Sequence, residues 1–176
     1  MLVSGQRTGR VFRDTSLGYF PNSLRAARSA FASLDRMKEP SMHTVEQMLE
    51  AYPKDLGNID RAKWTECIQA CFECAQTCTA CADACLSEDT VADLTKCIRA
   101  NLDCADICTT TGSALSRHTG YDANVTRALL EVCATACTSC GDSCEKHASM
   151  REHCRICAEA CRRCEQACRE LINSLN

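Results

Sequence analysis

Helix-breaking residues are scarce in this sequence. Only three prolines occur among 176 residues, all before residue 54, and there are seven glycines. Because a proline inside a helix costs about 3 kcal/mol, their absence after Pro53 leaves the rest of the chain free to form long helices. Aromatic residues are also few, at 5% of the chain, and Trp64 is the one tryptophan.

Long hydrophobic runs and an excess of basic residues are missing too. No run of 18 apolar residues occurs, so no transmembrane helix is predicted. Residues 42–176 hold 13 basic and 20 acidic residues, and this balance argues against nucleic acid as a partner. The N-terminus has neither a contiguous apolar segment nor a twin-arginine pair, so we expect no secretory signal and a cytoplasmic location.

The first 41 residues differ in composition from the rest. They are rich in arginine and serine, with seven basic residues against three acidic ones. Three interpretations remain open: a start site placed upstream of a natural beginning at Met42, a disordered tail, or an organelle-targeting segment. On each of them, we expect no site residue in 1–41 and a folded domain in 42–176.

The remaining chain reads as helices separated by short connections. Residues 43–52 predict a short amphipathic helix, ended by Pro53. Four longer helices are predicted at about 60–86, 90–118, 123–146 and 150–175.

Local signals mark several of the helix ends. Gly120 is predicted to be the glycine that ends the second long helix. Asp122 is predicted to be the N-cap of the third. Ser149 with Glu152 forms a capping-box pattern at the start of the fourth. Since the connections are short, neighbouring helices must run antiparallel. The predicted fold class is therefore all-α, an up-down-up-down four-helix bundle with an added N-terminal helix.

Cysteine is the abundant residue that sets this sequence apart. There are 18 cysteines in 176 residues, about one in ten, a level that indicates a special cysteine chemistry. In "CIQACFECAQTCTACADAC" they recur at steps of four and three, so they lie on one stripe of a helix. The same pattern recurs in all four long helices, at Cys67, Cys71, Cys74, Cys78, Cys81, Cys85; Cys97, Cys104, Cys108; Cys133, Cys137, Cys140, Cys144; and Cys154, Cys157, Cys161, Cys164, Cys168.

These stripes occupy the core positions of a bundle, and four explanations could account for them. Cysteine can serve as a small hydrophobic residue, but not plausibly 18 times. Disulfides are disfavoured because neighbours on one helix are poorly oriented for a bridge. An iron–sulfur site is disfavoured because "CRICAEACRRC" departs from ferredoxin spacing and lacks the following proline. A multinuclear store of a soft metal remains the best explanation.

Charge then favours copper over zinc. A dry core resists net charge, and stacked zinc sites with four thiolates each would carry −2 apiece. Cu(I) bridged by thiolates approaches one ion per sulfur and a nearly neutral cluster, and it is a soft ion that suits thiolate ligands. Buried thiols stay neutral until copper displaces their protons, so we expect the bundle to fold empty.

At this point the sequence resembles the bacterial copper storage proteins. "CFECAQTCTACADAC", "NLDCADIC" and "CRICAEACRRCEQAC" carry the resemblance, with "SRHTG" and "KHASMREHC" between them, and it covers residues 42–175. The resemblance implies a cytosolic homotetramer of cysteine-lined four-helix bundles that bind many Cu(I) ions through CxxxC and CxxC pairs. It also implies that copper passes in at one end, near His and Met ligands.

The two ends of the stripes differ. One end, here called the tryptophan end, continues into apolar side chains at Trp64, Leu115, Leu130, Leu171 and Leu175. The other, here called the histidine end, carries His147, Met150 and His153 around Cys85, Leu94, Cys97, Cys144 and Cys154. Imidazole and thioether groups hold copper less firmly than bridging thiolates, so we predict that copper passes in and out at the histidine end.

Two further polar residues fall on the stripe of the second helix. Asn101 replaces a cysteine in mid-core, where its amide must find a partner; contact with copper and a hydrogen bond to a thiol are both open. His118 lies at the tryptophan end, and we interpret it as a helix-terminal residue that interacts favourably with the helix dipole.

The predicted function is Cu(I) storage without enzymatic activity. The alternatives are a metallothionein-like Zn/Cd buffer and a disulfide-braced helical interaction module.

Overall fold

The computed structural model of this protein describes residues 40–175. Most of the segment 1–41 therefore lies outside the described residues. Within them the chain forms helices and no strand, in the order α2 (Pro40–Glu50), α3 (Arg61–Leu86), the 3₁₀ turn η1 (Val91–Leu94), α4 (Thr95–Leu115), α5 (Ala123–Glu145) and α6 (Glu152–Ser174).

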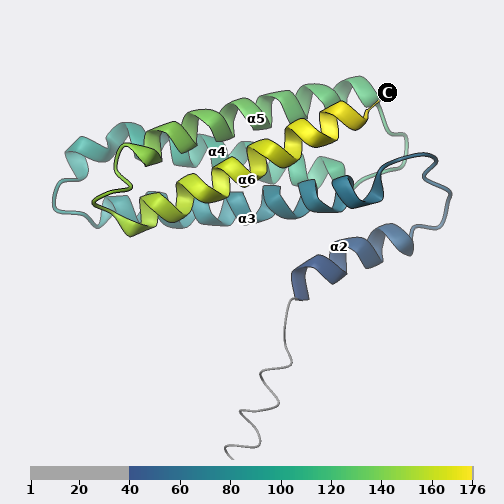
Figure 1. Ribbon diagram of the computed structural model, residues 1–176, viewed down its shortest axis with the longest axis horizontal. Helices are drawn as coiled ribbons and strands as arrows, with labels where there is room; N and C mark the ends of the chain where they lie inside the picture. The colour runs from purple at the N-terminus through teal and green to yellow at the C-terminus, as the bar shows by residue number, and fades with distance from the viewer. Residues whose placement is uncertain (1–39, 176) are drawn as a thin grey trace, which may run out of the picture. The chain divides into compact units, whose positions relative to one another are not determined.

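The four long helices form an antiparallel bundle, which confirms the predicted fold class. Each helix lies beside the one that follows it in sequence, and α6 returns beside α3 to close the bundle (Figure 1). The shorter helix α2 packs against α3, with Leu49 buried at the contact. None of the helices described here is long and apolar enough to cross a membrane.

The predicted starts of the first and third long helices are correct. Asp60 caps α3, its side chain accepting a hydrogen bond from the Lys63 amide. Asp122 caps α5 by accepting from the amides of Asn124 and Val125. In both cases a carboxylate satisfies amides that have no partner within the helix.

The predicted capping box of the fourth helix is wrong. The N-cap of α6 is Arg151, whose backbone is extended and whose side chain does not cap the helix. The chain first makes a turn in which the amides of Met150 and Arg151 both donate to the His147 carbonyl. This turn leaves Ser149 exposed and outside the helix.

The second helix is shorter than predicted at both ends. It begins at Thr95 because the residues before it form η1, which buries Leu94 completely. It ends at Leu115, where the Ser116 hydroxyl donates to the Gly112 carbonyl and closes the last turn. Gly120 has a φ of +67° but lies in the turn that follows, so its placement as the glycine that ends the helix is also wrong.

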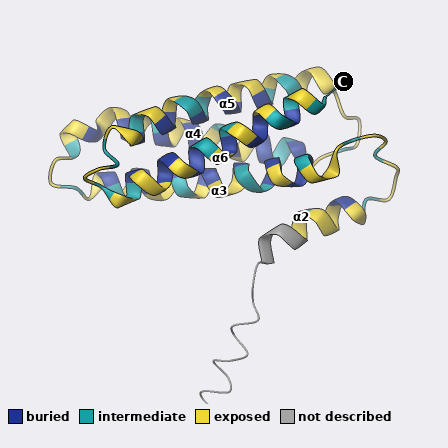
Figure 2. Cartoon of the chain, viewed as in Figure 1, coloured by how far each residue is buried: buried dark blue, intermediate teal, exposed yellow. Residues whose placement is uncertain are grey.

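The buried face of every long helix is lined with sulfur. Figure 2 shows the buried positions turned toward the inside of the bundle and the exposed ones outward. All 18 cysteines are buried, none more than 2% exposed, and small alanines flank them. At the tryptophan end, Trp64, Leu115, Leu130 and Leu171 are each at most 2% exposed, so large apolar side chains close the core there.

Candidate metal centre

The thiols converge along the axis of the bundle without forming disulfides. All 18 cysteines are free, and distances such as 3.6 Å between the Sγ atoms of Cys78 and Cys157 far exceed the roughly 2.05 Å of a disulfide. The helical steps of three and four place successive thiols on the axis, and the antiparallel packing brings stripes from different helices together. The result is a continuous core of unbridged sulfur.

Groups of four sulfurs follow one another along this core. Within each group, the ligand atoms all lie within 4.8 Å of one another. One group takes a single cysteine from each long helix, and neighbouring groups share members. Four of these groups are Cys71, Cys133, Cys164, Cys168; Cys74, Cys108, Cys137, Cys164; Cys74, Cys78, Cys104, Cys161; and Cys78, Cys140, Cys157, Cys161.

The sharing of sulfurs between groups determines which metal ions the core can bind. Four cysteines each belong to two of these groups, so metal ions in adjacent groups would be bridged by common thiolates; they are Cys74, Cys78, Cys161 and Cys164. Separate four-thiolate zinc sites would compete for those sulfurs and accumulate negative charge in a dry core. A soft monovalent ion of low coordination number fits shared thiolates at this density.

Two thiols at the histidine end, those of Cys154 and Cys97, favour the protonated form. Burial raises the pKa of Cys154 to about 12. The hydrogen bond with Cys144, and after it burial, also raises the pKa of Cys97. Neutral thiols pack as ordinary core atoms, and a metal ion that binds them must displace their protons.

Asn101 interrupts the stripe of α4 and is fully buried. Its Nδ2 donates to the Cys97 carbonyl at 2.9 Å, and its Oδ1 accepts from the Cys157 thiol at 2.9 Å and from the Cys140 thiol at 3.4 Å. The amide therefore has partners for both its donor and its acceptor. It lies where the central sulfurs meet those of the histidine end.

At the histidine end, His153 joins the sulfur core. Its Nδ1 lies 3.5 Å from the Sγ atoms of Cys81 and Cys154 and 3.9 Å from that of Cys85. These four residues form a further group whose ligand atoms lie within 4.8 Å. Because the His153 side chain is 25% exposed, this group includes a ligand atom on a residue that solvent reaches.

A carboxylate holds the other nitrogen of the same ring. His153 Nε2 lies 3.0 Å from Oε1 of Glu88, which is also 3.5 Å from Nε of Arg151. The hydrogen bond from His153, and after it the charge of Arg151, lower the pKa of Glu88 from its usual value, although desolvation acts in the opposite direction.

The structure places the other two residues of the predicted histidine end on the turn between α5 and α6. His147 lies partly exposed on the turn between α5 and α6, and Met150 is 72% exposed. Both were expected to continue a helical stripe, but α5 ends at Glu145 and α6 begins at Glu152. They therefore lie on the connection that leads into α6, just before the helical turn that carries His153.

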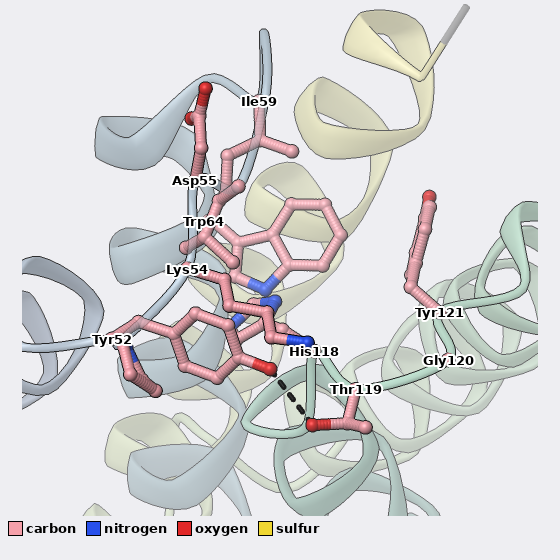
Figure 3. Close-up of a pocket in the computed structure, with 11 residues that line it drawn as sticks. Tyr52, Lys54, Asp55, Ile59, Trp64, His118, Thr119, Gly120 and Tyr121 are labelled. Atoms are coloured by element: carbon pink, nitrogen blue, oxygen red, sulfur yellow. Dashed lines mark hydrogen bonds between the residues drawn. The ribbon is translucent and has the colours of Figure 1, made fainter.

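The tryptophan end contains a cavity of about 300 Å³ outside the core (Figure 3). Trp64 lies between this cavity and the sulfur core, and its indole Nε1 donates to the Leu115 carbonyl at 2.8 Å. His118 packs against Trp64 and Tyr52, with ring centroids 5.5 Å apart in both pairs. This cavity lies at the opposite end of the bundle from His153 and contains no thiol.

The interpretation of His118 as a helix-terminal cation is wrong. The residue lies beyond the end of α4, in the turn before α5. Burial lowers its pKa, and its Nε2 is buried without a hydrogen-bond partner among the described residues. The neutral ring is therefore favoured, and its role is packing against Trp64.

Two residues of the core region were missed by sequence reasoning. Thr111 is fully buried, its hydroxyl donating to the Ile107 carbonyl; its position three residues after Cys108 on the stripe was a usable signal. Glu88 lies on the connection after α3, where no periodic pattern applies. Only the folded arrangement brings it to His153, which is 65 residues away.

Comparison with known proteins gives a consistent result. The family model described as copper storage protein matches residues 60–173. No curated protein matches the sequence at a significant level.

Several solved structures are similar to this chain. One is the copper storage protein Ccsp from Streptomyces lividans loaded with 10 copper equivalents, with 66% identity and a TM-score of 0.74, covering 74% of this chain and 99% of that one. A second, described as a cytosolic copper storage protein from Streptomyces lividans with five coppers, has 68% identity and a TM-score of 0.67, covering 68% and 100%. Apo copper storage protein 3 from Bacillus subtilis has 34% identity and a TM-score of 0.52, covering 61% and 96%.

Proposed function

This chain belongs to the copper storage protein family, and we propose that it stores many Cu(I) ions on the thiolates of its bundle core. The observation that carries the proposal is the run of four-sulfur groups with shared members along the axis. All 18 cysteines are the proposed ligands, with a capacity on the order of one copper per cysteine when thiolates bridge pairs of ions. The role is storage and sequestration rather than catalysis.

The histidine end is the proposed place of copper uptake and release. His153 supports this assignment most directly, because its Nδ1 lies beside three sulfurs and its side chain is partly exposed. His147 and Met150 lie on the connection that leads into α6 and are proposed as transient contacts only. Asn101 is proposed as a weak oxygen ligand once its thiol donors lose their protons.

The remaining assignments rest on the relatives. We propose a cytosolic location, in keeping with a Streptomyces lividans relative described as cytosolic, and a homotetramer, as the family resemblance implies. We also propose that residues 42–176 form the copper-binding domain and that 1–41 contribute no ligand.

Metal selectivity tests this proposal. Anaerobic, fully reduced protein would be titrated with Cu(I) and, separately, with Zn(II), each against a chelator of known affinity. We expect Cu(I) to bind more tightly and in several-fold greater number, because zinc needs about four thiolates per ion. Equal affinity with about four or five ions of either metal would instead favour the metallothionein-like buffer.

A further inference from the structure

The carboxylate of Glu88 and the ring of His153 make a contact that the storage of copper by thiolates does not require. The two residues lie on different elements, Glu88 on the connection after α3 and His153 in the first turn of α6. Their contact, at 3.0 Å between Oε1 and Nε2, is a hydrogen bond of ordinary length. It joins the sulfur core to a charged group at the surface.

This contact determines which nitrogen of the ring carries the proton. An ionised carboxylate can only accept a hydrogen bond, so the Nε2 of His153 must be the donor. In the neutral ring, Nδ1 then has a free lone pair, and Nδ1 is the atom that lies 3.5 Å from the sulfurs of Cys81 and Cys154. The ring is thus held in the tautomer and orientation needed to bind a metal ion beside those thiols.

Glu88 is itself held in place. Arg151 lies 3.5 Å from its carboxylate, and the Arg151 guanidinium also donates to the Thr90 hydroxyl at 2.7 Å. The Arg151 side chain is 14% exposed and that of Glu88 34%, so this pair is partly shielded from solvent, unlike an ion pair between two exposed side chains. It ties the connection after α3 to the first residue before α6.

We propose that Glu88 is a positioning residue that keeps the His153 ring oriented to accept Cu(I). Arg151, which is hydrogen-bonded to Thr90, helps to keep Glu88 in place. This inference rests on the proposed function, since it concerns how quickly the core fills and not whether the thiols bind copper. Loss of Glu88 leaves the ring free to turn or to change tautomer. The first ions then reach the sulfurs without an oriented imidazole.

The test compares Glu88→Ala with Glu88→Gln, Asp89→Asn and His153→Ala in the full chain. Asp89→Asn is the matched control, because Asp89 is an exposed acid on the same turn. Cu(I) would be presented anaerobically as its bathocuproine disulfonate complex, and the rate of transfer of the first equivalents and the final capacity would both be recorded. The ring tautomer of His153 would be read in the metal-free proteins by long-range ¹H–¹⁵N NMR.

We expect Glu88→Ala to slow the first transfers about tenfold, within the range known for lost partners of metal-binding histidines, with the final capacity unchanged. Glu88→Gln keeps an acceptor oxygen and should recover part of the rate, and Asp89→Asn should behave as wild type. NMR should show the Nε2-protonated ring in the wild type and a mixture in Glu88→Ala. The double variant Glu88→Ala/His153→Ala should be no slower than His153→Ala alone.

Wild-type rates and an unchanged tautomer in Glu88→Ala would overturn the proposal, as would a double variant slower than His153→Ala. Failure of the storage function gives a different result. In that case the wild type itself would take up few Cu(I) ions, whereas the tautomer in the metal-free protein would still report on Glu88.

Discussion

The two ends of the bundle are built from the same four helices but differ in chemistry. At the tryptophan end, large apolar side chains close the core, and the Trp64 indole spans it to reach the Leu115 carbonyl. At the histidine end, buried sulfurs meet the partly exposed His153, which in turn contacts Glu88 beside Arg151. One bundle can thus serve two tasks: the apolar end packs the core, and the polar end is where we propose that ions reach the thiols.

Removing sulfur from the middle of the core should have the largest effect. Replacing the four cysteines of one central group, Cys78, Cys140, Cys157 and Cys161, by alanine should lower copper capacity by about four ions, since capacity follows bridging thiolates. Anaerobic chelator competition measures this. Leu171→Ala, a buried substitution at the tryptophan end, is the control and should leave capacity unchanged; a similar loss there would mean that capacity reflects fold stability instead.

Truncating Trp64 should separate stability from binding. Trp64→Ala removes a nearly fully buried indole and leaves the Leu115 carbonyl without its donor. The free energy of unfolding should fall by about 3–5 kcal/mol, as measured by urea denaturation of the metal-free protein. Trp64→Phe should cost less because it keeps most of the volume. Copper capacity under native conditions should not change, and a reduced capacity would place a binding role at this end.

His153 should affect the rate of copper uptake more than the amount. His153→Ala removes the imidazole that lies beside three sulfurs and should slow the first transfers about tenfold, followed by stopped-flow absorbance. His147→Ala and Met150→Ala should have smaller effects, because both residues lie on the exposed turn. Equal slowing by all three variants would show that the whole turn, and not the oriented imidazole, controls uptake.

Asn101 tests whether the interruption of the sulfur stripe matters. Asn101→Ala removes a buried amide that bonds the Cys97 carbonyl and the Cys157 thiol, and it should destabilise the metal-free protein by about 1–3 kcal/mol. Asn101→Cys continues the stripe and should raise copper capacity by about one ion. An unchanged capacity in Asn101→Cys would show that the space beside this position admits no further ion.

The smallest effect should be a pH dependence at the tryptophan end. Burial lowers the pKa of His118 below its usual 6.5, so the unfolded chain binds the proton more readily than the folded one. The stabilising contribution is thus fully present above about pH 6.5 and is lost as the pH falls through the folded-state pKa. Thermal unfolding of the metal-free protein should show a steeper decline on acidification than in His118→Phe. Identical profiles would contradict a buried neutral ring.

Much of the fold could be predicted because the cysteine stripes carry an unambiguous helical period. Asp122 was recognisable as a cap for the same reason that it works, since a carboxylate satisfies free amides. The start of α6 was not predictable, because the turn at His147 satisfies the amides of Met150 and Arg151 before Ser149 can act as a cap. Likewise, the end of α4 depends on Ser116, which bonds back to Gly112.

The candidate site also has residues that the sequence predicts and residues that it does not. The core cysteines follow from periodicity, and His153 was identified from its place next to Cys154. Its partner Glu88 lies on an aperiodic connection, so only the packing of that connection against α6 reveals it. Met150 shows the opposite case, a residue placed on a stripe by spacing but exposed in the structure because the helix begins two residues later.

The central claim is that a preformed sulfur core fills with copper, and one titration tests it most directly. Fully reduced, metal-free protein would be titrated anaerobically with Cu(I) against a high-affinity chelator, with far-ultraviolet circular dichroism recorded at each addition. The account predicts tight binding of well over about ten ions per chain, with a constant helical signal from the empty to the full state. Saturation at about four or five ions, or a large change in helicity on loading, would contradict it.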